Sequence, residues 1–94
     1  MIDKKENYDI AVVGATGAVG RRILATLDER NFPVGRLSAL ASVRSVGQML
    51  PFRGKMIAVK ELRENSFVGM DIALFSAGSS ISKQYAPIAV KSGC

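Results

Sequence analysis

The feature that most constrains this chain is the segment at residues 10–20, IAVVGATGAVG, in which a short apolar run leads directly into three glycines. An unbroken apolar run of this kind is typical of a strand that is buried on both faces of a parallel sheet. Gly14, Gly17 and Gly20 follow at three-residue intervals, where the missing side chains permit positive φ and close packing of a helix on the strand. The segment therefore predicts a strand, a tight turn and a helix that begins near Ala18.

The turn between this strand and helix is a candidate phosphate site. The first amides of a helix have no acceptor within the helix, and the helix dipole adds positive charge at the same end. Anions are favoured there, and the pyrophosphate of a dinucleotide is the expected ligand. The hydroxyl of Thr16 either reaches a phosphate oxygen or only closes the turn. Because the spacing is G-x-x-G-x-x-G and not the commoner G-x-G-x-x-G, a tight turn without a ligand remains an alternative.

Length and composition limit the class of protein. A chain of 94 residues with 48% hydrophobic residues is one small globular domain or part of a larger one. No apolar run approaches the length of about 20 residues that a membrane span needs, and the charged N-terminus does not resemble a secretion signal. We expect a cytoplasmic protein that does not bind membranes, with a loose tail at residues 1–7.

Metals and nucleic acids are not expected ligands. Cys94 is the only cysteine and histidine is absent, so an internal disulfide is impossible and the usual ligands of a zinc site are missing. The net charge of +5 favours an anionic partner, but the 13 basic residues are scattered and are not interleaved with aromatic residues. A nucleotide cofactor accounts for this charge better than a nucleic acid does.

Apolar strand-like runs alternate with helical segments along the rest of the chain, which predicts an α/β fold with right-handed crossovers. We expect a Rossmann-like, mostly parallel sheet with helices on both faces. Its further elements are expected, in chain order, as a helix over 18–30, a strand over 37–41, a polar loop over 42–48, short strands over 50–52 and 56–59, a helical turn within 61–67, a buried strand over 71–76 and a helix over 81–92.

Particular residues are expected to shape these elements. The apolar stripe that the first helix turns toward the sheet consists of Val19, Ile23, Leu24 and Leu27. The pair at 53–54, Arg-Gly, is typical of a turn between two short strands, and Pro51 confines the first of these strands to a sheet edge. In the last helix, Pro87 either starts a second segment or kinks the first, and Gly93 ends it.

The loop after the second strand selects between NAD and NADP. NAD-selective sheets carry an Asp or Glu about 20 residues beyond the glycine turn, where it binds the ribose hydroxyls. This chain instead has Ser42 and Arg44, 22 and 24 residues after Gly20, with Ser45 adjoining. A guanidinium binds phosphate in a bidentate, charge-assisted manner, so these residues suit a 2′-phosphate and favour NADP. The alternative is that Arg44 is an ordinary solvated loop charge.

A third loop, SAGSS at residues 76–80, closes the strand expected over 71–76. Small residues with hydroxyls allow a flat ring or a diphosphate to pass close to the backbone. In the alternative interpretation the loop is an ordinary helix cap, with Ser79 or Ser80 as the capping residue. The chemistry of these residues favours neither interpretation over the other.

Five segments of the chain occur in a recognisable order. They are GATGAVG at 14–20, NFPV at 31–34, LASVRSVG at 40–47, FVGMDIALFSAG at 67–78 and YAPIAVKSG at 85–93. Together they resemble the start of the aspartate-semialdehyde dehydrogenases, from about Tyr8 to the last residue. The glycine motif alone also fits extended short-chain reductases, but its ordered combination with ASVRS and DIALFSAG is highly specific.

This resemblance implies an NADP-dependent enzyme that interconverts aspartyl phosphate and aspartate semialdehyde through a cysteine thioester. The reaction belongs to the biosynthesis of lysine, methionine, threonine and diaminopimelate, and the family resemblance suggests a homodimer. By the same likeness, the pyrophosphate is held by Thr16, Gly17, Ala18 and Val19, the 2′-phosphate by Arg44 and Ser45, and the nicotinamide half lies near Ser76, Ala77 and Gly78.

The catalytic cysteine, histidine and substrate-binding arginines of that family come after the matched region, and Cys94 does not lie in the family's cysteine motif. We therefore expect residues 1–94 to be the N-terminal part of an NADP-binding domain, without the catalytic and dimerisation domain and inactive alone. The alternatives are a stand-alone or vestigial nucleotide-binding module and a short-chain reductase. The second lacks support, because Tyr85 is followed by Ala89 and not by the lysine of a Tyr-x-x-x-Lys pair.

One further expectation follows from an incomplete sheet, and another from the position of Cys94. An unpaired edge with apolar surface predicts weak stability or self-association. Cys94, which follows the end of the last helix, is expected to be a small buried thiol.

Overall fold

The computed structural model describes residues 7–76 and 79–94. The tail expected over residues 1–7, apart from Asn7, and the candidate residues Ala77 and Gly78 lie outside the described residues. The described elements, in chain order, are β1 (Tyr8–Val13), α1 (Ala18–Glu29), β2 (Val34–Ala41), the 3₁₀ helix η1 (Val43–Ser45), β3 (Met49–Phe52), β4 (Lys55–Glu61), the 3₁₀ helix η2 (Glu64–Phe67), β5 (Ile72–Phe75) and α2 (Ser79–Lys91).

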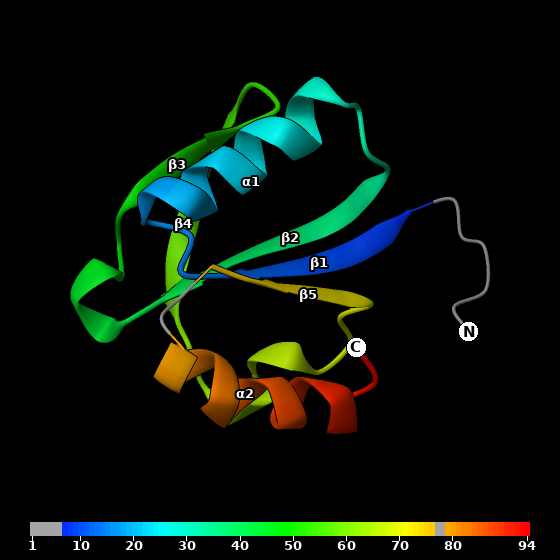
Figure 1. Cartoon of the computed structure of the whole chain (residues 1–94). Helices are drawn as coiled ribbons and strands as arrows, with labels where there is room; N and C mark the ends of the chain where they lie inside the picture. Colours follow the sequence, from blue (N-terminus) through cyan, green and yellow to red (C-terminus); the bar gives the residue numbers. More distant parts are fainter. Residues whose placement is uncertain (1–6, 77–78) are drawn as a thin grey trace.

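The strands form one sheet with the order β3-β4-β2-β1-β5. β1 pairs in parallel with β2 and β5, β2 pairs in parallel with β4, and β3 alone within this sheet runs antiparallel. In Figure 1, α1 covers one face of the sheet, while α2 and η2 cover the other. The predicted Rossmann-like, mostly parallel sheet is confirmed. The strand order reverses at β1, so the crevice beyond the carboxyl ends of β1 and β5 is where a ligand is expected.

β1 supplies the centre of the core because its side chains alternate between the two helical layers. Ile10 and Val12 pack with Leu24 of α1. Ala11 and Val13 belong to the opposite cluster, which contains Phe67 of η2 and Ala89 of α2. Each of these four side chains is at most 1% exposed. Burial on both faces explains why the run at the start of the chain is unbroken rather than alternating.

The apolar stripe of α1 is narrower than predicted. Leu24 is buried, and Ile23 and Leu27 are partly buried against the same cluster, as expected. Val19 is 62% exposed, so its predicted place in the stripe is wrong. In the first turn of α1, the buried residue is Gly20 and not the adjacent Val19. Val19 therefore faces away from the packed side of the helix.

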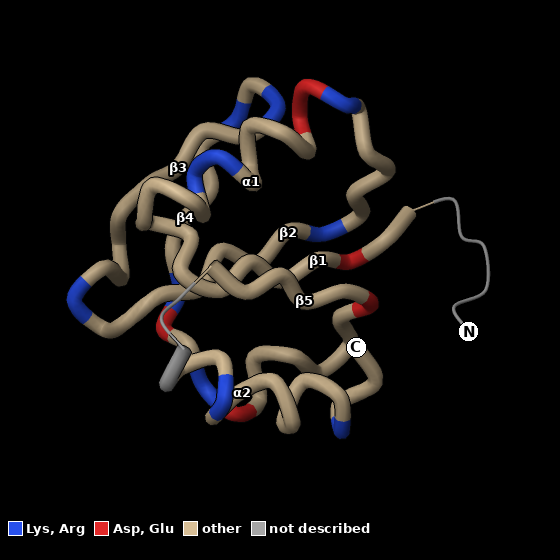
Figure 2. The backbone as a smooth tube through the Cα atoms, viewed as in Figure 1, with Lys and Arg blue, Asp and Glu red and all other residues tan. Residues whose placement is uncertain are grey.

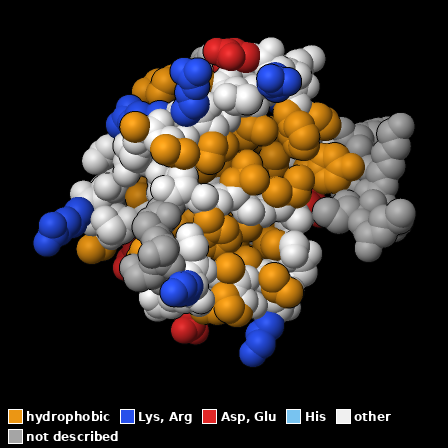
Figure 3. All heavy atoms as spheres, in the orientation of Figure 1, with side chains coloured by type: hydrophobic (Ala, Val, Ile, Leu, Met, Phe, Trp, Pro, Cys, Tyr) orange, Lys and Arg blue, Asp and Glu red, His pale blue; other side chains and the backbone are white. Residues whose placement is uncertain are grey.

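β5 is less buried than the predicted strand over 71–76, since each of its residues is only partly buried. The reason is its place at the edge of the sheet, with β1 as its one neighbour in the described chain. Figure 3 shows hydrophobic side chains gathered between the two helical layers, on the face where β5 lies in Figure 1. The apolar edge expected from the sequence is present.

The starts of β2 and α2, and the course of α2 at Pro87, differ from the prediction in informative ways. β2 begins at Val34, three residues earlier than expected, because its first residue already pairs with Tyr8 across the sheet. α2 begins at Ser79, two residues earlier than expected, so both serines of the third loop belong to the helix. The helix also continues through Pro87 without a second start.

The turns expected at glycines are confirmed. Arg53 and Gly54 have φ values of 52° and 76°, as a two-residue hairpin turn requires, and β3 with Pro51 lies at the sheet edge. Gly93 has a φ of 98°, and its amide donates to the carbonyl of Val90. The next amide donates to Ala89, which completes a Schellman motif at the end of α2.

Gly20 determines how closely α1 approaches β1. A Cβ placed on Gly20 would lie 2.2 Å from the carbonyl oxygen of Gly14 and 2.7 Å from the Cα of Ala15. Both are backbone atoms, so neither can rotate away from an added methyl group. The third glycine of the motif is therefore required by the packing of the helix on the strand.

We predict that Gly20→Ala destabilises the fold, because the methyl group pushes α1 away from the turn. The free energy of unfolding should fall by about 1–3 kcal/mol or more, the usual cost of overpacking, as measured by urea denaturation followed by circular dichroism. Gly17→Ala is the control, since its added Cβ would meet the oxygen of Gly14 at 3.5 Å, an ordinary contact. A Gly20→Ala variant as stable as this control would contradict the close approach.

Candidate functional site

The glycine turn is held rigidly against the sheet. Gly14 has a φ of 81°, which favours glycine, and its amide donates to the carbonyl of Leu40 at 2.8 Å. The amide of Ala15 donates to the same oxygen at 3.2 Å. Two bonds to β2 therefore anchor the turn at the carboxyl end of β1, where the strand order reverses.

The first turn of α1 is left without a protein cap. Its N-cap is Gly17, which has no side chain to accept from the helix, and the first turn contains no acidic residue. The amides of Ala18 and Val19 thus have no acceptor within the helix. An anion placed before this turn would accept from them and lie at the positive end of the helix dipole.

The packing of the protein does not explain why residue 17 is glycine. Its φ is −74°, which any residue adopts, and an added Cβ would make only one ordinary contact with the protein. Gly17 is exposed, so a side chain there would project toward the space in front of the helix. Protein packing therefore does not require glycine at position 17, whereas it does require Gly20.

The loop after β2 lies beside the glycine turn. The hydroxyl oxygens of Thr16 and Ser45 are 3.4 Å apart, which joins the two predicted phosphate-binding segments into one surface. Ser42 precedes η1 and is exposed. Arg44 is exposed within η1, and its guanidinium has no hydrogen bond or ion pair with any residue that the structure describes. Its charge is therefore unpaired among the described residues, one position before Ser45.

Ser76 supports the glycine turn from the other side. Its hydroxyl lies 2.8 Å from the carbonyl oxygen of Val13 and 3.1 Å from that of Gly14, and it donates to this pair. A hydroxyl has one proton, so Ser76 offers a ligand only its lone pairs. The end of β5 is thereby tied to the turn. The predicted cofactor contact of Ser76 stays a prediction.

A hollow of about 330 Å³ opens at the carboxyl ends of the strands. The predicted residues that line it are Gly14, Thr16 and Ser42. Its other side is formed by residues that were not predicted to bind the cofactor, namely Glu61 and Leu62 at the end of β4, and Ile81, Gln84 and Tyr85 of α2. Two positions could have indicated these residues in the sequence. Glu61 ends the strand β4 and Leu62 follows it, and Ile81, Gln84 and Tyr85 lie in the first turns of α2, the helix that follows β5.

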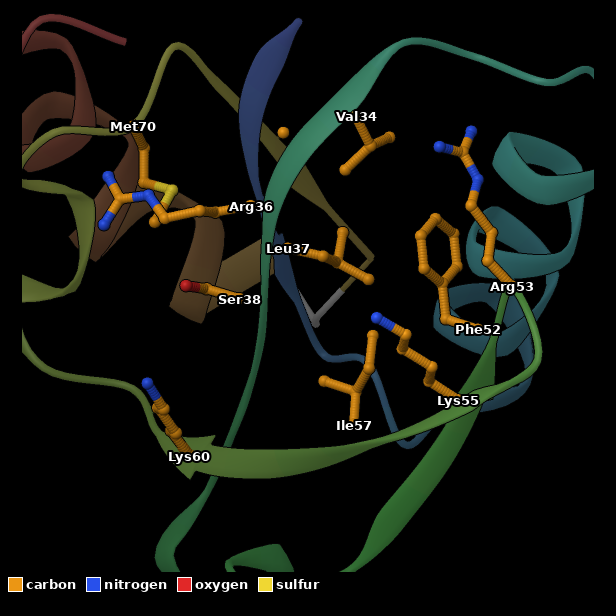
Figure 4. A pocket seen from close by; sticks show the side chains of 11 residues that line it. Val34, Arg36, Leu37, Ser38, Phe52, Arg53, Lys55, Ile57, Lys60 and Met70 are labelled. Atoms are coloured by element: carbon orange, nitrogen blue, oxygen red, sulfur yellow. The ribbon is translucent and has the colours of Figure 1, made fainter.

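A larger hollow of about 480 Å³ lies elsewhere, between the first half of β2 and the β3–β4 hairpin (Figure 4). Its arginines are already engaged, since Arg36 pairs with Asp9 at 3.1 Å and Arg53 donates to the carbonyl of Phe32. Figure 4 shows the side chain of Arg36 directed toward Met70 and away from Ile57. This hollow is near the amino ends of the strands, so it is not part of the candidate cofactor site.

Charge is spread over the molecule. Figure 2 shows lysines and arginines on α1, on the hairpin, on the loop after β2 and on α2 rather than on one face. Within residues 7–76 and 79–94, no helix is long and apolar enough to span a membrane. The same residues contain no group of three or more His, Cys, Asp or Glu that could hold a metal ion.

Comparison with known proteins identifies the domain. Residues 9–94 match the family model described as "Semialdehyde dehydrogenase, NAD binding domain". The chain belongs to the semialdehyde dehydrogenase family. A nicotinamide dinucleotide is therefore the class of cofactor for which this domain is built.

Proteins with similar sequences narrow the resemblance to the aspartate-semialdehyde dehydrogenases. The chain is 59% identical over 87 residues to the aspartate-semialdehyde dehydrogenase of Aquifex aeolicus, and this match covers 92% of the chain and 26% of the relative. It is 54% identical to that of Legionella pneumophila, covering 94% and 25%. The predicted resemblance to aspartate-semialdehyde dehydrogenases is confirmed. The chain spans about a quarter of the length of these curated relatives.

Solved structures agree with the fold of this semialdehyde dehydrogenase domain. One neighbour is aspartate semialdehyde dehydrogenase II from Vibrio cholerae, described as complexed with ASA, with 46% identity and a TM-score of 0.89 over 93% of this chain and 29% of that one. Another is a probable aspartate-semialdehyde dehydrogenase from Pseudomonas aeruginosa, with 39% identity and a TM-score of 0.89 over 94% and 26%.

Cys94 lies away from this site. Its sulfur is 3.4 Å from the carbonyl oxygen of Met70 and 3.8 Å from that of Phe67, to which the thiol donates. Burial, together with the carboxylate of Asp71, raises the pKa of the Cys94 thiol. The thiol is partly buried rather than fully buried as predicted. Its surroundings disfavour the thiolate, which is the form a nucleophile requires.

We predict slow alkylation of Cys94. Because its pKa is raised, the thiolate fraction near pH 8 is smaller than in an unfolded chain, and the rate with iodoacetamide should continue to rise at higher pH. The measurement is the pH profile of alkylation, followed by mass spectrometry. The same protein in concentrated urea is the control, and equal rates in the two samples would contradict the prediction.

Proposed function

We propose that this chain supplies the NADP-binding part of an aspartate-semialdehyde dehydrogenase. The observation that carries the proposal is the uncapped first turn of α1 behind the side-chain-free Gly17, which the contact between Thr16 and Ser45 joins to the loop of Arg44. When bound, NADPH would supply the hydride that reduces the acyl group of aspartyl phosphate to the semialdehyde. Residues outside this chain would hold the substrate, the nucleophile and the acid or base.

The pyrophosphate would lie against the glycine turn. The amides of Ala18 and Val19 would donate to its oxygens, Thr16 would add a hydroxyl, and Gly17, whose own amide donates to the carbonyl of Gly14 at 3.1 Å, would let the ligand approach the backbone. Gly14 would keep the turn in the left-handed conformation that presents these amides. On the β5 side, Ser76, Ala77 and Gly78 would lie near the nicotinamide half.

The 2′-phosphate would distinguish NADP from NAD. Arg44 would bind it through a charge-assisted pair, with Ser42 and Ser45 adding hydroxyls. η1 has no acidic residue in its first turn, so nothing in this helix repels a phosphate or prefers a free ribose hydroxyl. The distance of 3.4 Å between Thr16 and Ser45 supports one continuous path from pyrophosphate to 2′-phosphate.

The remaining parts of the proposal follow from the resemblance to aspartate-semialdehyde dehydrogenases. The complete enzyme would serve the biosynthesis of lysine, methionine, threonine and diaminopimelate in the cytoplasm, as a homodimer that acts on small molecules and not on nucleic acids. Residues 1–94 alone would bind the cofactor without turnover. The chain would be the N-terminal part of the cofactor domain, with the catalytic and dimerisation domain elsewhere.

Selectivity for NADP is tested by isothermal titration calorimetry of the purified chain with NADP and NAD. We expect NADP to bind more tightly, and Arg44→Ala to reduce the NADP preference by about one to two orders of magnitude, since a hydrogen bond to a charged group contributes about 1.5–3 kcal/mol. Arg30→Ala removes the same charge at the far end of α1 and should leave the preference unchanged. Equal affinities for NADP and NAD in the parent chain would refute the assignment of Arg44.

Gly17→Ala tests the pyrophosphate cradle separately. The added methyl group should weaken both NADP and NAD about tenfold or more, because it blocks close approach to the helix amides, while the melting temperature stays near that of the parent. Titration of the variant with each cofactor measures this. Unchanged affinity in a folded Gly17→Ala protein would mean that the pyrophosphate does not lie against this turn.

A further inference from the structure

We propose that the carboxylate of Glu61 recognises the adenine of the cofactor by accepting a hydrogen bond from its exocyclic amine. This inference rests on the proposed function, because it extends the path of NADP beyond the 2′-phosphate. It assigns a role to a residue at the end of β4 that the glycine motif and the arginine loop do not involve.

The register of the sheet places Glu61 next to the arginine loop. Ala41 pairs with Glu61 across β2 and β4, and the segment from Ser42 to Ser45 follows immediately after Ala41. A cofactor that runs from the glycine turn of β1 to the end of β2 meets β4 as the next strand. Neighbouring strands are about 4.8 Å apart, so a base joined to the ribose at Arg44 would reach the end of β4.

The hollow at the strand ends has room in that direction. Glu61 lines it together with Gly14 and Thr16 of the glycine turn. Val43 lines the same hollow and is 66% exposed, so its apolar side chain is available to a ligand. Val43 would give the flat face of a base an apolar surface, while the carboxylate would meet its polar edge.

The hydrogen bonds of Glu61 leave one oxygen open. Arg63 donates twice to the carboxylate, from Nη2 at 2.9 Å and from Nε at 3.2 Å, and both bonds go to Oε1. Among the described residues, Oε2 accepts no hydrogen bond. An ionised carboxylate is an acceptor only, so its partner must be a donor such as the adenine amine. The ion pair with Arg63 also offsets the negative charge that would otherwise repel the nearby phosphates.

The test compares NADP with its hypoxanthine analogue, in which a carbonyl oxygen replaces the amine, by calorimetric titration of the whole chain. The parent should prefer NADP by about tenfold or more, as expected for a lost bond to a charged group. Glu61→Gln should bring this ratio close to one, because an amide can present either a donor or an acceptor. Glu64→Gln, which makes the same charge change in the neighbouring η2 turn, should keep the parent's ratio.

The possible outcomes separate this inference from the proposed function. Equal binding of NADP and the analogue by the parent, or a preference that survives in Glu61→Gln, would overturn the role of Glu61 while leaving NADP binding intact. A changed NADP-to-NAD ratio in Glu61→Gln, with an unchanged adenine preference, would place the carboxylate at the ribose and also overturn it. Failure of the parent to bind NADP at all would refute both proposals. The parent's own ratio remains decisive if Glu61→Gln does not fold.

Discussion

The contact between Gly20 and the backbone of Gly14 and Ala15 is the constraint on which the site depends. It lets α1 start directly above the end of β1, so that the first amides of the helix meet the crevice where the strand order reverses. The turn between them is then fastened from two sides, by Leu40 of β2 and by the hydroxyl of Ser76. Gly20 thereby sets the position of the helix, while the positive φ of Gly14 shapes the turn and Gly17 leaves the first amides open.

Much of the fold could be predicted because its signals are local. The unbroken run of β1, the Arg53-Gly54 turn and the stop at Gly93 each depend on a few neighbouring residues, and all are confirmed. The exposure of Val19 and the partial burial of β5 could not be predicted in the same way. They depend on which side of α1 meets the sheet and on which strand lies at its edge, and both are properties of the assembled sheet.

In the candidate site, too, the residues that could be predicted are those whose signal is local in the sequence. The glycine turn and the arginine loop are contiguous in sequence, and each predicts an anion from the chemistry of its own residues. Glu61 joins them only through the pairing of β4 with β2, which no spacing within either motif reveals. Ser76 lies where it was expected, yet the structure adds that its proton is directed to the backbone of the turn, a detail that depends on the contact between β5 and β1.

The two edge strands of the sheet differ in how well a further strand can pair with them. On one side β3 is short and antiparallel and contains Pro51, which has no amide to donate, so a further strand would find an incomplete ladder there. On the other side β5 is parallel to its neighbour, lacks proline and is only half covered. Any enlargement of the sheet, whether by more of the polypeptide or by a foreign strand, is consequently directed to β5, and the architecture grows in one direction only.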